Sequence, residues 1–185
     1  MALVESNPFE KGKKAPDFNL FDTVSGENLS LNNLKGDKGT VIMFICNHCP
    51  YVLHVNPELV KLANDYKDKG IAFIAISSNS VDSHPQDGPN FMTVQAKKLA
   101  YPFPYLYDET QEIARAYDAV CTPDFYVFDA NLGAIYHGQL DDSRPGNGVE
   151  LSGGSIRNVL DAVLEGEELT EVEKPSIGCS IKWKV

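Results

Sequence analysis

The chain has 185 residues, of which 43% are hydrophobic, and it carries a net charge of -10 at pH 7. This length and composition can fill one sizeable core, so a single domain is expected. The negative charge would repel phosphate backbones and anionic membranes, which excludes nucleic acid and membrane surfaces as expected partners. Residues 1–16 contain no apolar secretory segment and no stretch is apolar enough to cross a membrane, and these observations predict a cytoplasmic protein.

The N-terminal part is predicted to add a small hairpin to the domain. Residues 1–15 are polar and carry three lysines, which indicates a surface segment. Residues 17–20 and 27–31 are typical of two short strands joined by a turn at Ser25-Gly26. Residues 40–45 then form a continuous apolar run, which predicts a strand covered on both faces.

A CxxC sequence follows this buried strand and precedes a helix. Asn56-Pro57-Glu58 is a strong helix start, so the helical region after Cys49 is predicted to be kinked or split at Pro57. Residues 71–77 are again typical of a buried strand. The short links in this strand-helix-strand unit predict two parallel strands with a right-handed crossover.

The second half of the chain is predicted to alternate helices with strands. Two prolines in residues 101–107 allow only a short strand at a sheet edge. The first helix of this half is expected to use Phe91, Val94, Gln95 and Leu99 on its inner face. The other expected elements are helices over residues 91–100, 109–117 and 154–165, antiparallel strands over residues 124–129 and 134–139, and exposed loops over residues 78–90 and 141–153.

Residues 16–166 are therefore predicted to form the domain itself, with residues 167–185 as a C-terminal tail that packs on it. The tail ends in PSIGCSIKWKV, which contains the one tryptophan of the sequence. His84 lies in a proline-containing loop and His137 on a predicted strand, and both are expected to be solvated.

The four cysteines are too few for the disulfide framework of a small secreted domain. Cys46 and Cys49 form the CxxC, Cys121 directly precedes a Thr-Pro dipeptide, and Cys179 lies near the C-terminus. In a reducing compartment structural disulfides would not persist, so this arrangement indicates catalysis or metal binding.

The order of elements and the motifs resemble the thioredoxin fold and, more narrowly, the peroxiredoxin-like members of the alkyl hydroperoxide reductase and thiol-specific antioxidant family. This resemblance implies an α/β protein with a thioredoxin-like fold, in which helices flank a central mixed β-sheet and the N-terminal β-hairpin is an extension. It also implies a cis peptide bond at Thr122-Pro123, where an extended substrate would bind opposite the dithiol. The matching segments are APDF (residues 15–18), FICNHCP (44–50), FPYLYDETQEIARAY (103–117), CTPDFYVFD (121–129) and GCSIKWK (178–184).

The chemistry of the dithiol follows from the residues around it. A thiolate, not a thiol, attacks a disulfide, so the nucleophile must ionise near neutral pH. Cys46 is expected to be that nucleophile, because the helix N-terminus and His48 both favour its charged form. Cys49 is expected to resolve the mixed disulfide. Cys121 and Cys179 are candidates for additional redox thiols, although Cys121 is more typical of a small core residue and Cys179 lies in an exposed-looking tail.

The predicted function is a thiol-disulfide oxidoreductase that requires no cofactor. Its expected partners are protein or small-molecule disulfides and a thiol reductant such as thioredoxin or glutathione. Slow thiol-dependent peroxide reduction is compatible with this chemistry. A fast peroxiredoxin-type peroxidase is disfavoured, because Cys46 stands where the resemblance calls for a hydroxyl residue before Cys49-Pro50, and residues 122–128 contain no arginine to polarise a peroxide.

Two further classes of function remain open. Cys46, Cys49, His48 and His54 lie close together in the sequence, and His137 could add a distant metal ligand. Soft thiolates suit copper(I) or zinc, so a metal-binding protein of the same fold is one alternative. A non-catalytic binding module is the other, because thioredoxin folds also serve as binding platforms.

Overall fold

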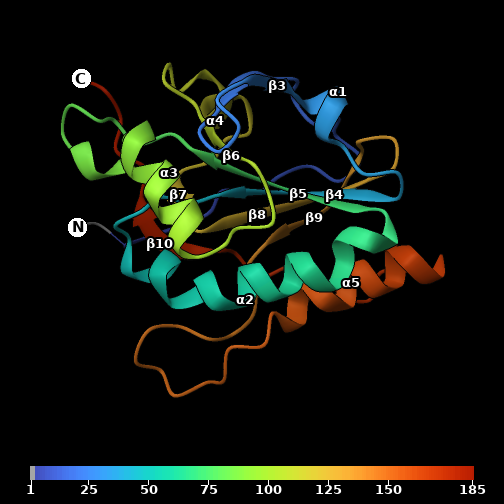
Figure 1. The fold of residues 1–185 in the computed structure, drawn as a ribbon. Helices are drawn as coiled ribbons and strands as arrows, with labels where there is room; N and C mark the ends of the chain where they lie inside the picture. The colour runs from blue at the N-terminus through green and yellow to red at the C-terminus, as the bar shows by residue number, and fades with distance from the viewer. Residues whose placement is uncertain (1–2) are drawn as a thin grey trace.

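The molecule is organised around a mixed β-sheet, as the computed structural model shows for residues 3–185 (Figure 1). Within these residues seven strands form one sheet in the order β3-β2-β6-β5-β4-β8-β9, and three shorter ones form a second sheet in the order β1-β10-β7. The strands are β1 (Leu3–Glu5), β2 (Asn19–Asp22), β3 (Asn28–Ser30), β4 (Gly39–Phe44), β5 (Ile71–Ser77), β6 (Tyr105–Tyr107), β7 (Cys121–Thr122), β8 (Asp124–Asp129), β9 (Ala134–Gly138) and β10 (Ile177–Ser180).

Helices cover both faces of the large sheet, which makes three layers (Figure 1). Buried residues of α2, α3 and α5 pack on one face, and those of α1 and α4 belong to the core on the other face. The helices are α1 (Leu31–Leu34), α2 (Pro50–Tyr66), α3 (Pro89–Lys98), α4 (Glu112–Ala116) and α5 (Gly154–Glu165), with short 3-10 turns η1 (Lys67–Lys69) and η2 (Pro85–Asp87). The architecture is therefore the mixed sheet with flanking helices that the sequence predicts.

Strand β4 lies in the interior of the sheet, between β5 and β8, and contributes to both cores. Val41 and Met43 face the core under α2 and α5, whereas Ile42 and Phe44 face the opposite core. β4 pairs in parallel with β5 and antiparallel with β8, so both of its edges are hydrogen-bonded. This fixed strand leads directly into the CxxC.

Helix α2 begins at Pro50 and runs through Pro57 as one element, so a split at Pro57 is wrong, and the alternative of a kink stays a prediction. Asn56, expected as a helix cap, lies inside the helix and is buried. Its side-chain oxygen accepts a hydrogen bond of 2.8 Å from the Tyr101 hydroxyl. This contact satisfies a polar group that would otherwise be costly to bury.

Two predictions about the second half of the chain are also wrong. Strand β6 is not an edge strand, because β2 of the N-terminal hairpin pairs with its outer side. Helix α3 buries Met92 and Ala96. Of the predicted face, Leu99 packs against the core, whereas Phe91 and Val94 are 56% and 62% exposed. A one-residue displacement turns a helix by about 100°, so a small error in the predicted face exchanges buried for exposed positions.

The two ends of the chain meet on the small sheet. β10 lies between β1 and β7, and it pairs antiparallel with both strands. Phe9 is only 8% exposed and packs in a core, so the N-terminal segment is not confined to the surface as predicted. The domain boundaries after residues 15 and 166 stay a prediction.

Among residues 3–185, none of the helices combines the length and the apolar character needed to span a bilayer.

Candidate active site

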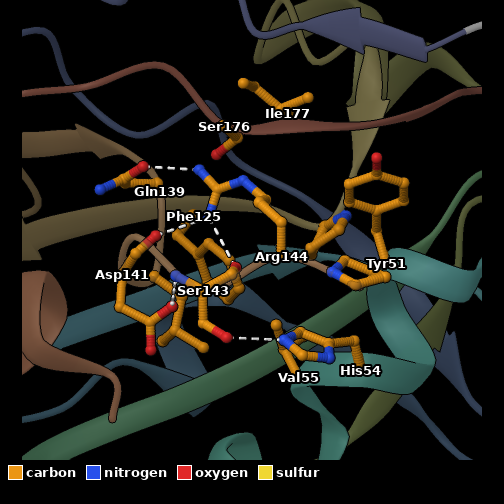
Figure 2. Close-up of a pocket in the computed structure, with 13 residues that line it drawn as sticks. Tyr51, His54, Val55, Phe125, Gln139, Asp141, Ser143, Arg144, Ser176 and Ile177 are labelled. Carbon is orange, nitrogen blue, oxygen red and sulfur yellow. Dashed lines mark hydrogen bonds between the residues drawn. The ribbon is translucent and has the colours of Figure 1, made fainter. Parts of the chain in front are cut away.

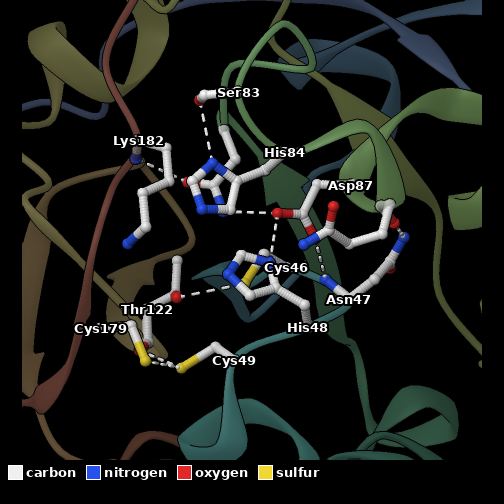
Figure 3. Close-up of polar contacts among 12 residues, drawn as sticks. Cys46, Asn47, His48, Cys49, Ser83, His84, Asp87, Thr122, Cys179 and Lys182 are labelled. Carbon is white, nitrogen blue, oxygen red and sulfur yellow. Dashed lines mark hydrogen bonds and ion pairs between the residues drawn. The ribbon is translucent and has the colours of Figure 1, made fainter. Parts of the chain in front are cut away.

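The CxxC lies where β4 ends and α2 begins (Figure 3). Cys46 is two residues beyond the end of β4, and Cys49 is the residue that precedes the first turn of α2. Both are buried, with 1% and 0% of their surface exposed. All four cysteines of the chain are free thiols in this structure.

Thr122 faces the dithiol from the opposite side, and the predicted cis peptide bond at Thr122-Pro123 is confirmed. The Thr122 hydroxyl lies 3.4 Å from Cys46 Sγ. The Thr122 carbonyl oxygen lies 3.4 Å from Cys49 Sγ. One residue therefore contacts both sulfurs, which come from a different part of the chain.

Asp87 lies next to the dithiol and was not predicted. It is fully buried and accepts hydrogen bonds from the Asn47 backbone N–H at 2.8 Å and the Asn79 side chain at 2.8 Å. Its carboxylate also lies 2.5 Å from His48 Nδ1. Cys46 Sγ, a ring nitrogen of His48 and a carboxylate oxygen of Asp87 all lie within 4.8 Å of one another. The site thus contains a cysteine, a histidine and an aspartate in close proximity.

His48 is oriented so that one of its two ring nitrogens has a hydrogen-bond partner and the other has none among the described residues. Nδ1 faces Asp87, whereas the buried Nε2 has no hydrogen-bond partner among the described residues. The ring of His84 stacks on the His48 ring, with a centroid distance of 4.9 Å and an interplanar angle of 25°. Partial burial and the nearby charges of His48 and Lys182 lower the pKa of His84. His84 therefore covers the site, although it was expected to be an ordinary solvated residue.

The two thiols differ in acidity, and the order is the opposite of the one predicted. A hydrogen bond from Cys46 lowers the pKa of Cys49 to about 5, and further hydrogen bonds from Cys179 and from the Val52 N–H act in the same direction. The same hydrogen bond to Cys49, burial and the negative charge of Asp87 raise the pKa of Cys46. The helix N-terminus therefore stabilises a thiolate at Cys49 rather than at Cys46.

Cys179 lies against the dithiol, whereas it was expected in an exposed-looking tail. It is 4% exposed, and its Sγ lies 2.6 Å from Cys49 Sγ. Burial and the neighbouring Cys49 raise the pKa of Cys179 to about 12. Cys121 is fully buried, and burial and the charge of Asp124 raise the pKa of its thiol.

His54 and His137, the other histidines considered as metal ligands, form other contacts. His54 Nε2 lies 2.8 Å from the Ser143 hydroxyl. His137 is 6% exposed and its Nε2 lies 2.9 Å from an Asp124 carboxylate oxygen, so the prediction that it is solvated is wrong. Neither residue is among the donors gathered around Cys46.

A small pocket opens beside Pro123, next to the start of α2 (Figure 2). Arg144 closes one side and donates a hydrogen bond of 2.6 Å to the Gln139 side chain. The Ser176 hydroxyl is buried and has no hydrogen-bond partner among residues 3–185. The pocket is lined by Tyr51, His54, Val55, Pro123, Phe125, Gln139, Leu140, Asp141, Ser143, Arg144, Pro145, Ser176 and Ile177.

Each arginine of the chain makes contacts away from the two CxxC sulfurs. Arg115 lies over the Trp183 ring at 4.4 Å, Arg144 binds Gln139 and Arg157 pairs with Glu58 at 2.6 Å. The donor that would polarise a peroxide oxygen in a fast peroxidase is thus not supplied by these three side chains.

Comparison with known proteins identifies the family. Residues 11–137, more than half of the chain, match the AhpC/TSA family. The chain belongs to the AhpC/TSA family. It is 29% identical over 127 residues to the thiol-disulfide oxidoreductase ResA of Bacillus thuringiensis subsp. konkukian, with 69% of this chain and 68% of that protein covered. The ResA of B. thuringiensis strain Al Hakam is 30% identical over the same length and coverage.

Solved structures agree with this assignment. A conserved uncharacterized protein of Geobacillus kaustophilus has a TM-score of 0.98 and 60% identity, with 100% of this chain and 97% of that chain covered. A hypothetical protein of Sinorhizobium meliloti 1021 has a TM-score of 0.94 and 40% identity, with 97% and 98% covered. A thiol:disulfide interchange protein DsbE described from Chlorobium tepidum, at a TM-score of 0.66, 20% identity and coverage of 85% and 99%, supports the thioredoxin-like fold alone. The predicted fold and the predicted class, a thiol-disulfide oxidoreductase, are confirmed.

Proposed function

We propose that the thiols of Cys46 and Cys49 exchange with the disulfide of an extended substrate that binds along Thr122-Pro123. The observation that carries this proposal is the contact of Thr122 with both sulfurs, at 3.4 Å each. An extended chain can pair with the backbone at such a position, as in other cases of strand addition. The pocket beside Pro123 is then available for a side chain of the substrate.

Cys46 is proposed to attack first. Its Sγ lies within 4.8 Å of a His48 ring nitrogen, whereas Cys49 Sγ contacts Cys179 and the Thr122 carbonyl oxygen (Figure 3). His48 accepts the Cys46 proton, and the thiolate attacks one sulfur of the substrate disulfide. The other substrate sulfur leaves as a thiolate, and a mixed disulfide remains on Cys46.

Cys49 is proposed to complete the reaction. Once Cys46 carries the mixed disulfide it can no longer donate to Cys49, but the hydrogen bonds from Cys179 and the Val52 N–H still favour the Cys49 thiolate. It attacks Cys46, forms the Cys46–Cys49 disulfide and releases the second substrate thiol, which takes the proton from His48. Asp87 acts as a positioning residue, since it orients the His48 ring through Nδ1.

Trapping distinguishes the two roles. In Cys49→Ser the mixed disulfide on Cys46 cannot be resolved, so this variant is expected to retain a stoichiometric amount of a disulfide-bonded peptide. Cys46→Ser is expected to retain none. The adducts can be measured by intact-protein mass spectrometry after alkylation, with Cys121→Ser as a buried control that should react like the unmodified protein.

Two results would contradict this proposal. If Cys46→Ser trapped the peptide and Cys49→Ser did not, Cys49 would be the attacking residue. If neither variant trapped it and the Cys46–Cys49 disulfide never formed in a glutathione redox buffer, the dithiol would not be redox-active.

The cellular partners are part of the proposal. A thiol reductant such as thioredoxin or glutathione would return the Cys46–Cys49 disulfide to the dithiol. The cytoplasm is the proposed compartment, because the four cysteines do not resemble a secreted disulfide framework. Fractionation of cells followed by detection of the protein tests this location.

Metal binding is a second candidate function, and it rests on the proximity of Cys46, His48 and Asp87. The unpartnered His48 Nε2 and the two sulfurs of the CxxC would offer nitrogen and sulfur ligands that suit zinc or copper(I). A metal carrier should purify with one metal ion per chain, and His48→Gln should lower that ratio. A protein that is free of metal after purification and fails to bind added zinc would exclude this candidate.

A further inference from the structure

We propose that Cys179 is a third redox thiol, which takes over the disulfide from Cys46 and stores it as Cys49–Cys179. This inference rests on the proposed function of the CxxC and extends it. Three thiols rather than two would then share one disulfide, and Cys49 would be common to both positions of the bond.

The position of the sulfurs carries this proposal. Cys179 Sγ lies 2.6 Å from Cys49 Sγ, and both side chains are almost completely buried. A disulfide bond requires about 2.05 Å between the sulfurs, so only a small movement separates the contact from a bond. Cys49 also interacts with Cys46 on its other side. Its sulfur therefore has two neighbouring thiols within reach.

The small sheet holds Cys179 in this position. Cys179 is paired with Thr122 on β7 and with Leu3 on β1, so β10 is fixed along both edges. Gly178 allows the close approach, because a Cβ atom there would overlap the Thr122 carbonyl group. The same residue, Thr122, thus contacts both CxxC sulfurs and pairs with the strand that carries Cys179.

The proposed transfer is an intramolecular thiol-disulfide exchange. The Cys179 thiolate attacks Cys49 Sγ, the Cys49–Cys179 bond forms and the Cys46–Cys49 bond breaks. The electron pair of the broken bond leaves with Cys46, which takes up the proton that Cys179 gave up. No external oxidant or reductant is consumed, because one disulfide and one thiol are present before and after the step.

The consequence is that Cys46 becomes a free thiol again while the protein stays oxidised. Cys46 lies beside His48, which can return its proton. Cys49 and Cys179 are 0% and 4% exposed, so the stored disulfide is buried, and it lies against β10 instead of beside His48. A reductant must reach Cys49 or Cys179 to remove it, so the two disulfides are expected to differ in their rate of reduction.

Disulfide mapping tests the proposal. The reduced protein is exposed to glutathione disulfide, quenched with acid, alkylated and digested, and the cross-linked peptides are identified by mass spectrometry. The unmodified protein is expected to form the Cys49–Cys179 disulfide besides Cys46–Cys49, and Cys179→Ser only the Cys46–Cys49 disulfide. Cys121→Ser, which removes an equally buried thiol, should leave the pattern unchanged.

The outcomes separate this inference from the proposed function. A folded unmodified protein that forms Cys46–Cys49 but in which Cys179 always stays alkylated would overturn the third thiol. Absence of both disulfides in the unmodified protein would instead contradict the proposed function. Circular dichroism of each variant verifies the fold.

Discussion

Cys49 owes its acidity to groups from three separate parts of the chain. Cys46 precedes it in the CxxC, Val52 lies in the first turn of α2, and Cys179 lies on β10. Each of them stabilises a negative charge on the Cys49 sulfur, so removal of any one of them should raise its pKa. The sequence suggested the helix and the CxxC but could not indicate the contribution of Cys179.

An absorbance titration of the reduced protein measures this acidity. The thiolate of Cys49 is expected to appear as pH rises through about 5 and to persist above it. Cys46→Ala removes the first hydrogen-bond donor, so the midpoint should move up toward the ordinary value of about 8.5. Cys121→Ala serves as the control and should leave the midpoint in place. A titration that disappears in Cys46→Ala but remains in Cys49→Ala would reverse the assignment.

His48 should affect the attack by Cys46 and its dependence on pH. In the Cys49→Ser background, His48→Gln is expected to slow formation of the mixed disulfide by about 100-fold at neutral pH, the usual effect of losing a general base. The rate should recover at high pH, where Cys46 ionises without a base.

His84→Gln is the matched control for this measurement. His84 stacks on His48 but does not bind Asp87, so its replacement should have a much smaller effect. Asp87→Asn should reproduce part of the His48 defect with the same recovery at high pH. Equal rates for His48→Gln and the parent protein across the pH range would exclude His48 as the base.

At the scale of secondary structure, β10 is the element on which the site depends most. Gly178→Ala should displace this strand from β7, because the new methyl group would overlap Thr122. Overpacking of this kind costs about 1–3 kcal/mol, which urea unfolding can measure. The same variant should form less Cys49–Cys179 disulfide. Gly154→Ala, at the first residue of α5, is the control and should be nearly neutral, since the nearest atom to its new Cβ is the flexible Ser152 side chain.

Elements with a strong local pattern could be predicted from the sequence. β5, β8 and α5 have the predicted boundaries, because continuous apolar runs and a stripe with helical spacing mark them clearly. β1 and β10 contain three and four residues, and their mixed burial gives no periodic signal. Their pairing is decided by contacts between the two ends of the chain.

The site likewise contains residues that a local sequence pattern marks and residues that only contacts between distant parts of the chain bring in. Cys46, Cys49 and Thr122-Pro123 could be recognised by spacing and by the family resemblance. Asp87 could not, because it reaches His48 across 39 positions through a loop that seemed merely exposed. A buried carboxylate in such a loop has no sequence signature apart from the polar residues that surround it.

For the whole molecule, the small sheet joins three distant regions next to the dithiol. β1 comes from the N-terminal segment, β7 from the second half of the domain and β10 from the C-terminal segment. Ser6 N–H donates to the Ser176 carbonyl at 2.9 Å, which extends this connection beyond the strands. The C-terminal end of the chain lies on the side of the molecule that carries β7 and β10 (Figure 1).

The contact between Cys49 and Cys179 also connects redox state to the entropy of the unfolded chain. The two residues are 130 positions apart, whereas the CxxC closes a loop of only a few residues. Chain-entropy arguments give about 5 kcal/mol of stabilisation for the long loop and about 2 kcal/mol for the short one. The oxidised unmodified protein should therefore gain more in melting temperature over its reduced form than oxidised Cys179→Ser does, as calorimetry can measure. The location of one disulfide would then determine how readily the protein unfolds and becomes accessible to a protease.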